Sequence, residues 1–223
     1  ASATYSTGAQ IGTTWQQFQW FLLDDVNNDR FADIVAARPD GTLLLYTNTG
    51  DGNAPYNTGT VIGSAWQQFR NVTLGDVTGD GRADLVAARP DGTLWLYTNN
   101  GNDTSPYGTG TQIGVSWGQF GWILAGAVTG DGRADIVAVR SDGTLWLYTN
   151  GGSDTAPYST GVQIGLGWQS FNRVMLGDVD GDRRADIIAT KPDGTLWLYL
   201  NSGSDTAPYS TGAQLGTGWQ QFA

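Results

Sequence analysis

The segment LGDVTGDGRADLVAARPDGTLWLY, residues 74–97, decides the fold of this chain. It alternates short apolar or β-branched runs with an aspartate loop at 76–84 and a Pro-Asp-Gly turn at 90–92. Runs of this kind, bounded by turn residues, are typical of β-strands. The pattern predicts a unit of four short strands, at 72–74, 85–88, 93–98 and 111–113.

The third predicted strand of this unit is apolar on both faces. Leu94 and Leu96 point to one side, whereas Trp95 and Tyr97 point to the other. A sheet built from such strands must be covered on both faces, which a two-sheet sandwich does not provide. We therefore expect four-stranded sheets stacked radially as the blades of a β-propeller, with a solenoid as the alternative.

The unit repeats without a change of register. Its tryptophan recurs every 51 residues, at Trp15, Trp66, Trp117, Trp168 and Trp219. A fixed period of about this length indicates a repeat architecture. The predicted units span about 20–69, 71–120, 122–171 and 173–222, with an extra half-repeat at 1–18. We thus predict one all-β domain over 1–223, a propeller of four blades with an additional outer-strand segment.

The composition excludes several classes of function. The chain has no Cys, no His and no Glu, and all 21 acidic residues are Asp. Disulfides, thiolate or imidazole metal sites and Glu acids are therefore excluded. A net charge of -10 argues against nucleic acid as a partner, since its backbone requires basic patches. No run approaches the roughly 20 apolar residues of a membrane-spanning helix, so membrane insertion is not expected.

Four nine-residue loops, at 25–33, 76–84, 127–135 and 178–186, place oxygen-bearing side chains at positions 1, 3, 5 and 9, apart from Ala127 at position 1 of the third. With the backbone carbonyl of position 7, these oxygens form a donor set that suits Ca²⁺. The alternative is that such Asp-Gly loops are only good turns. The predicted ligands are Asp25, Asn27, Asp29, Phe31, Asp33, Asp76, Thr78, Asp80, Arg82, Asp84, Thr129, Asp131, Arg133, Asp135, Asp178, Asp180, Asp182, Arg184 and Asp186.

The loops differ in ways that predict different affinities. Ala127 replaces the first Asp of the third loop, so the site at 127–135 is expected to be weakest or absent. The fourth loop carries the most carboxylates and is expected to bind most tightly. An EF-hand is excluded because position 12 holds alanine instead of glutamate, for example Ala87. The expectation is three or four calcium ions.

At these residues the sequence resembles the FG-GAP, or VCBS, repeats of integrin α propellers, fungal propeller lectins and secreted actinobacterial proteins. The resemblance covers the whole chain and is strongest at 74–97, although Phe-Gly itself occurs only at Phe120–Gly121. It implies that each aspartate loop is a calcium-binding hairpin between the innermost strand and the next. It also implies an extracellular, secreted protein.

The extra outer-strand segment bears on how the ring closes. Residues 5–18 and 209–222 are both last-strand segments, so one is surplus to a closed ring of four blades. We hypothesise that a second copy completes the propeller, which removes exposed strand edges. A fragment of a longer protein and an engineered sequence are the alternatives.

Catalysis is not expected. An active site is asymmetric, yet every carboxylate belongs to a loop, a turn or a polar segment that recurs in each unit, apart from Asp24, which adjoins the first loop. No carboxylate therefore remains as a unique acid or base.

Aromatic side chains that recur once per unit are candidate platforms for sugars, because a flat ring stacks on the apolar face of a sugar. A tryptophan in every connection is also typical of packing between blades. Trp20 and Trp122, present only in alternate units, are less bound to the repeat. We predict a lectin or carbohydrate-binding module, with a protein-binding adhesion propeller and purely structural calcium as the alternative. The candidate platforms are Trp15, Trp66, Trp117, Trp168, Trp219, Tyr56, Tyr107, Tyr158 and Tyr209.

Overall fold

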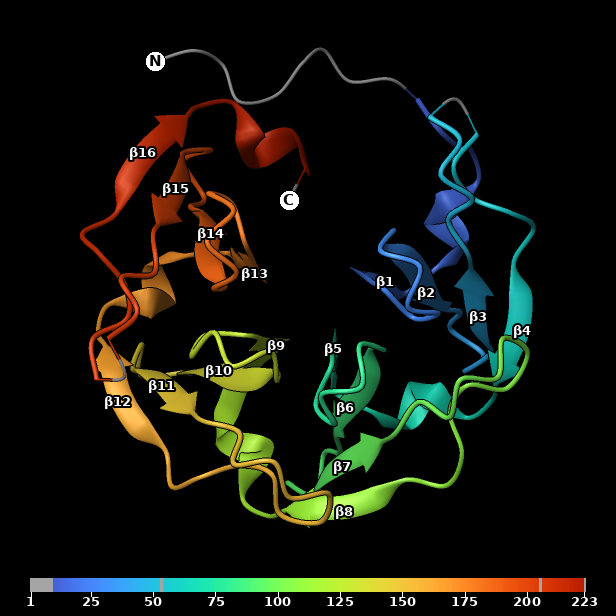
Figure 1. Ribbon diagram of the computed structural model, residues 1–223. Coiled ribbons are helices and arrows are strands. Elements are labelled where there is room, and N and C mark those ends of the chain that lie inside the picture. Colours follow the sequence, from blue (N-terminus) through green and yellow to red (C-terminus); the bar gives the residue numbers. More distant parts are fainter. Residues whose placement is uncertain (1–9, 53, 205, 223) are drawn as a thin grey trace.

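Four antiparallel sheets of four strands each surround a central opening (Figure 1). This computed structural model describes residues 10–52, 54–204 and 206–222. Each sheet follows the chain order of its strands, from an inner strand at the opening to an outer strand at the rim. The sheets are arranged radially, so the fold is a β-propeller and the solenoid alternative is wrong.

The strands recur at equivalent positions in the four blades. Blade 1 contains β1 (Trp20–Asp24), β2 (Asp33–Ala37), β3 (Leu43–Tyr46) and β4 (Thr60–Gly63). Blade 2 contains β5 (Asn71–Gly75), β6 (Asp84–Ala88), β7 (Leu94–Tyr97) and β8 (Thr111–Gly114). Blade 3 contains β9 (Phe120–Gly126), β10 (Asp135–Arg140), β11 (Leu145–Tyr148) and β12 (Val162–Gly165). Blade 4 contains β13 (Arg173–Gly177), β14 (Asp186–Thr190), β15 (Leu196–Tyr199) and β16 (Ala213–Gly216).

The core lies between neighbouring blades. Every residue of β2 and of β6 is buried, as expected for strands covered on both faces. Val35, Leu45 and Leu85 belong to one buried cluster that joins blade 1 to blade 2. Burial of apolar surface contributes about 25 cal/mol per Å², so these seams hold the blades together.

A short 3₁₀ turn precedes blade 1, and another follows each of the four blades; sequence periodicity did not indicate these turns. These turns are η1 (Trp15–Gln17), η2 (Trp66–Gln68), η3 (Trp117–Gln119), η4 (Trp168–Ser170) and η5 (Trp219–Phe222). The residue before η2 is Ala65, with φ of 67° in the left-handed region, and Gly167 takes the same conformation before η4. A left-handed residue reverses the chain at the rim, and a turn of three residues is too short for a helical pattern.

The two end blades leave apolar side chains open. Phe21 and Leu23 of β1 are each 53% exposed, whereas Leu74, at the position of Leu23 in blade 2, is buried. Met175 of β13 is 43% exposed on blade 4. Blades 1 and 4 face one another across the opening at the top of Figure 1.

The predicted outer-strand segment at 1–18 lies partly outside the described residues, at 1–9. Its described part, residues 10–18, contains η1. None of the helices in the described residues is long and apolar enough to cross a membrane.

Candidate metal loops and the seams between blades

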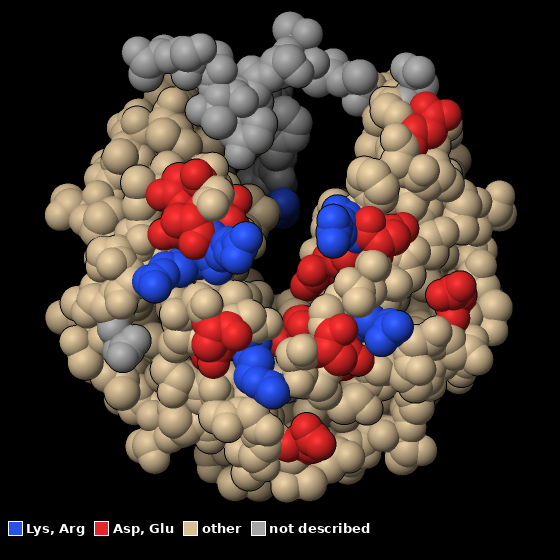
Figure 2. All heavy atoms as spheres, viewed as in Figure 1, with Lys and Arg blue, Asp and Glu red and all other residues tan. Residues whose placement is uncertain are grey.

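The aspartate loops join the innermost strand of each blade to its second strand. Figure 2 shows acidic and basic side chains gathered around the central opening, where these loops lie. The loops of neighbouring blades are also joined by backbone bonds. The N–H of Ala83 donates to the carbonyl of Asp25 at 2.8 Å, and Ala134 donates to Asp76 at 2.7 Å.

The last Asp of each loop is a structural anchor. Asp33, Asp84, Asp135 and Asp186 are all 0% exposed. In blade 2, the Asp84 carboxylate accepts the N–H of Val77 at 2.9 Å on one oxygen and that of Asn99 at 2.7 Å on the other. Burial raises the pKa of Asp84 to about 6. Such a carboxylate ties the start of its loop to the segment that follows the third strand.

The first Asp of the loop organises its interior. The Asp76 carboxylate accepts N–H groups from Gly79 at 2.6 Å and Gly81 at 2.7 Å. Asp25 and Asp178 hold their loops in the same way. These bonds curl the chain around the carboxylate, as an Asx-type turn does.

Three carboxylates converge in the fourth loop. Asp178, Asp180 and Asp186 each offer an oxygen, and these oxygens lie within 4.8 Å of one another. This is the one such group of three in the part of the chain that the structure describes. Asp182, which the sequence placed in this ligand set, is not in the group, and its Oδ1 accepts the N–H of Arg184 at 2.8 Å.

The remaining loops bring fewer carboxylates together because position 3 holds Asn27, Thr78 or Thr129. In every loop the residue at position 7 donates its N–H to the Asp at position 5, as Arg82 does to Asp80 at 2.9 Å. The equivalent bonds run from Phe31 to Asp29, from Arg133 to Asp131 and from Arg184 to Asp182.

An asparagine that sequence reasoning missed links each blade to the one before it. The side chain of Asn99 donates to the carbonyl of Val26 at 2.8 Å and to that of Ala83 at 3.2 Å. Asn150 and Asn201 repeat the first bond at 2.9 Å each. The available signal was the recurrence of Asn at 48, 99, 150 and 201, with the 51-residue period.

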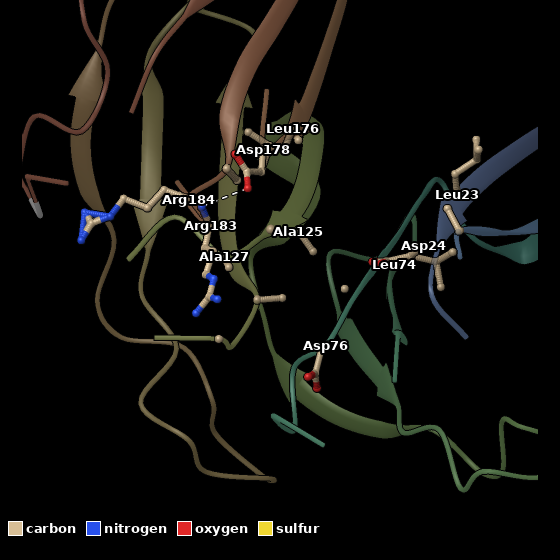
Figure 3. A pocket seen from close by; sticks show the side chains of 17 residues that line it. Leu23, Asp24, Leu74, Asp76, Ala125, Ala127, Leu176, Asp178, Arg183 and Arg184 are labelled. Atoms are coloured by element: carbon tan, nitrogen blue, oxygen red, sulfur yellow. Dashed lines mark hydrogen bonds between the residues drawn. The ribbon is translucent and has the colours of Figure 1, made fainter. Parts of the chain in front are cut away.

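A cavity of about 390 Å³ lies in the central opening and is lined by the ends of the innermost strands and by residues of the aspartate loops. Figure 3 shows Asp24 and Asp76 on one side of it, and Asp178 and Arg183 on the other. Asp24 stands where the other units have glycine, and burial raises its pKa to about 6. No feature of the repeat explains this extra carboxylate.

The recurring tryptophans lie in the seams between blades. Trp66 contacts Tyr97 of the next blade with ring centroids 4.9 Å apart, and Trp117 and Trp168 make the same contact with Tyr148 and Tyr199. All three indoles are buried. A buried ring has no face free for a sugar, so the structure favours the packing role here. Trp15 and Trp219 are partly buried.

The four recurring tyrosines are also buried or partly buried. Tyr107 is buried and donates to the carbonyl of Ala83 at 3.0 Å. The hydroxyls of Tyr158 and Tyr209 are buried, and burial raises the pKa of both phenols. Tyr56 is partly buried. Burial therefore argues against Tyr107 as a platform, whereas Tyr158 and Tyr209, like Tyr56, are partly buried residues.

Radial four-stranded blades with aspartate hairpins between their two inner strands define a repeat propeller. The sequence pattern of the FG-GAP-like repeat matches three overlapping stretches, 25–87, 76–138 and 128–189. The chain belongs to the FG-GAP-like repeat family.

Two further comparisons concern curated proteins and solved structures. None of the curated proteins matches the chain. Among solved structures 113 chains match, including one described as the crystal structure of BBS1N in complex with ARL6DN, soaked with mercury. That structure has a TM-score of 0.43 and 12% identity over 86% of this chain, which spans about half (52%) of its length.

Proposed function

We propose that this FG-GAP repeat propeller is a secreted, non-catalytic carbohydrate-binding module that carries calcium in its aspartate loops. The observation that supports calcium most directly is the convergence of Asp178, Asp180 and Asp186 within 4.8 Å. Three carboxylates on one short loop match the hard oxygen ligands that Ca²⁺ prefers, so the residues present fit this ion.

The proposed ions differ among the loops. Asp178, Asp180 and Asp186 hold the ion of the fourth loop. The first and second loops each supply three carboxylates, at positions 1, 5 and 9, and the third supplies two, at positions 5 and 9. A bound divalent cation contributes positive charge beside carboxylates that otherwise repel one another in a chain of net charge -10.

Carbohydrate binding is proposed because an assembly of several copies of this chain can present several weak sites to a branched ligand, and linked sites multiply weak affinities. A protein ligand, with calcium only stiffening the scaffold, is the second candidate. The burial of Trp66, Trp117 and Trp168 favours this second candidate, because it removes the platforms that recur in each unit.

Two measurements test these proposals separately. Thermal unfolding in excess chelator and in excess calcium tests the metal, since an ion that binds only the folded state raises the melting temperature. Identical melting curves would exclude a bound ion. A glycan array probed with the calcium-loaded protein tests the ligand class. Absence of binding on the array would leave the protein-binding candidate.

We also propose that a second copy of the chain covers the open ends. Phe21 and Leu23 on blade 1 and Met175 on blade 4 occupy positions that face neighbouring blades inside the ring. The interior seams are the pattern that we propose for the packing of blade 4 of one copy on blade 1 of another. Light scattering during size-exclusion chromatography is expected to give a multiple of the chain mass. The monomer mass at micromolar concentration would contradict this.

A further inference from the structure

A small pocket lies where blade 3 meets η4, away from the aspartate loops. Its volume is about 200 Å³, and its lining includes Trp122, Arg140, Ser141, Gln169 and Phe171. Trp122 is partly buried against the core between blades 3 and 4. The pocket is smaller than the roughly 300–1,000 Å³ of sites for drug-sized ligands, so it suits one ring.

The pocket coincides with positions at which unit 3 departs from the repeat. Position 121 is Gly, whereas the other units carry Gln19, Arg70 and Asn172. Position 141 is Ser, whereas the others carry Pro39, Pro90 and Pro192. Position 122 is Trp. Blade 1 also has a tryptophan here, Trp20, whereas blades 2 and 4 carry Asn71 and Arg173. A site that differs from the repeated framework is what a specific ligand requires.

Gly121 opens the entrance. In blade 2 the side chain at this position crosses the seam, where Arg70 donates to the carbonyl of Gly118 at 3.1 Å. In blade 4, Asn172 accepts a bond from Thr190 at 2.9 Å. Gly121 has no such side chain, and β9 bulges there, since Phe120 pairs with Arg140 and Trp122 with Val139.

The groups around the pocket suit a carbohydrate. The partly buried indole of Trp122 provides apolar surface on which the apolar face of a pyranose can stack, and the buried Phe171 lines the pocket beside it. Ser141 and Gln169 provide a hydroxyl and an amide that can both donate and accept hydrogen bonds. The guanidinium of Arg140 is held over Trp146, 4.0 Å from the ring centroid, so this wall is preorganised.

We propose that this pocket binds a single terminal sugar, with Trp122 as the stacking platform and Ser141 and Gln169 as its polar partners. The proposal rests on the proposed carbohydrate function and names the unit that carries it. It places one site per chain at blade 3, whereas the recurring aromatic residues suggested one per unit.

The repeat supplies variants that are expected to fold. Trp122→Asn, Gly121→Asn and Ser141→Pro each introduce the residue that another blade carries at the same position. Trp20→Asn is the matched control, because it makes the same change in blade 1, where Gln19 and Pro39 occupy the positions of Gly121 and Ser141. Melting curves establish that each variant is folded.

The experiment has two arms, both with calcium present. In the first, wild type and variants are applied to a glycan array. In the second, free glucose, galactose, mannose, fucose and N-acetylglucosamine are titrated while the indole N–H signal of Trp122, assigned from its absence in Trp122→Asn, is followed by NMR. We expect Trp122→Asn to weaken binding at least about tenfold, a difference readily measured in dissociation constants. Gly121→Asn is expected to weaken it similarly, and Trp20→Asn to leave it unchanged.

The outcomes separate the two proposals. Array binding that survives Trp122→Asn would overturn the pocket and keep the carbohydrate function. An indole shift that Gly121→Asn abolishes, without array binding, would support the pocket and show that its affinity is too low for detection on the array. If neither arm detects a sugar, both proposals fail.

Discussion

The third and fourth aspartate loops have the same hairpin framework but different donor sets. Asp135 and Asp186 are equally buried, and each accepts the N–H of the asparagine 15 residues further on at 2.8 Å. Asp178 accepts the N–H groups of Gly181 and Arg183 at 2.7 and 2.9 Å, whereas Ala127 has no carboxylate with which to do so.

The third loop nevertheless keeps its path. Gly130 and Gly132 take the left-handed conformation, with φ of 77° and 89°, as Gly79 and Gly81 do in the second loop at 79° and 85°. The buried Asp at position 9 therefore suffices to fix the hairpin. The Asp at position 1 adds internal bonds and, in our proposal, a ligand to calcium.

The largest expected effect on stability comes from removing the buried Asp at position 9, which all four loops share. Asp135→Ala leaves the N–H groups of Thr129 and Asn150 without their acceptor in a buried site. Each unsatisfied buried group costs about 1–3 kcal/mol, so we expect the free energy of unfolding in urea to fall by about 3–5 kcal/mol. The loss should be the same in chelator and in calcium. A loss below about 1 kcal/mol would contradict the anchoring role.

The next effect separates the two loops. Asp178→Ala gives the fourth loop the residue that the third already has at this position. With calcium at 100 times the dissociation constant of the site, the variant should lose about 2.7 kcal/mol of calcium-dependent stabilisation. Calorimetric titration should count one ion fewer. Asp131→Ala in the third loop is the control, and equal losses in the two variants would contradict the proposed difference.

The reverse substitution should create a site. Ala127→Asp makes the third loop match the second at positions 1, 3, 5 and 9. At calcium ten times the new dissociation constant, the folded state should gain about 1.4 kcal/mol that wild type lacks. Titration should count one ion more than in wild type. An unchanged count would show that the second loop, with the same donors, does not hold an ion either.

The smallest expected effect concerns backbone strain. Arg183 has φ of 70°, at a position where the second and third loops have Gly81 and Gly132. Arg183→Gly should raise the free energy of unfolding by up to about 1 kcal/mol, because the left-handed conformation disfavours side chains with Cβ. Gly132→Arg should lower it by a similar amount. A lower free energy of unfolding for Arg183→Gly, or a higher one for Gly132→Arg, measured by urea denaturation, would refute this account.

Much of the fold was predictable because it is encoded locally. The 51-residue period located the four blades, and the strands predicted at 85–88 and 93–98 differ from β6 and β7 by at most one residue at each end. The matching family pattern confirms the resemblance. What the sequence concealed depends on partners distant in the chain. The bond from Asn99 to Val26 joins residues 73 apart, and no periodic pattern identifies its carbonyl acceptor.

The candidate sites were predicted only in part, for the same reason. Charge count placed Asp182 with its neighbours, but its carboxylate does not join those of Asp178, Asp180 and Asp186. The sequence prediction took as sugar platforms the aromatic residues that recur in every unit. Trp122, Gly121 and Ser141 come together where it varies, and only the packing of blade 3 on η4 reveals their common pocket.

The asparagine that joins each blade to its predecessor has a consequence for how such chains change in length. Asn99, Asn150 and Asn201 reach a valine carbonyl 73 residues earlier in every case, and each bond involves only adjacent units. A recombination event that deletes or inserts one whole repeat would join two loops that already fit. The junction would re-form the same contacts, so propellers of different sizes can arise from this chain without redesign of any interface.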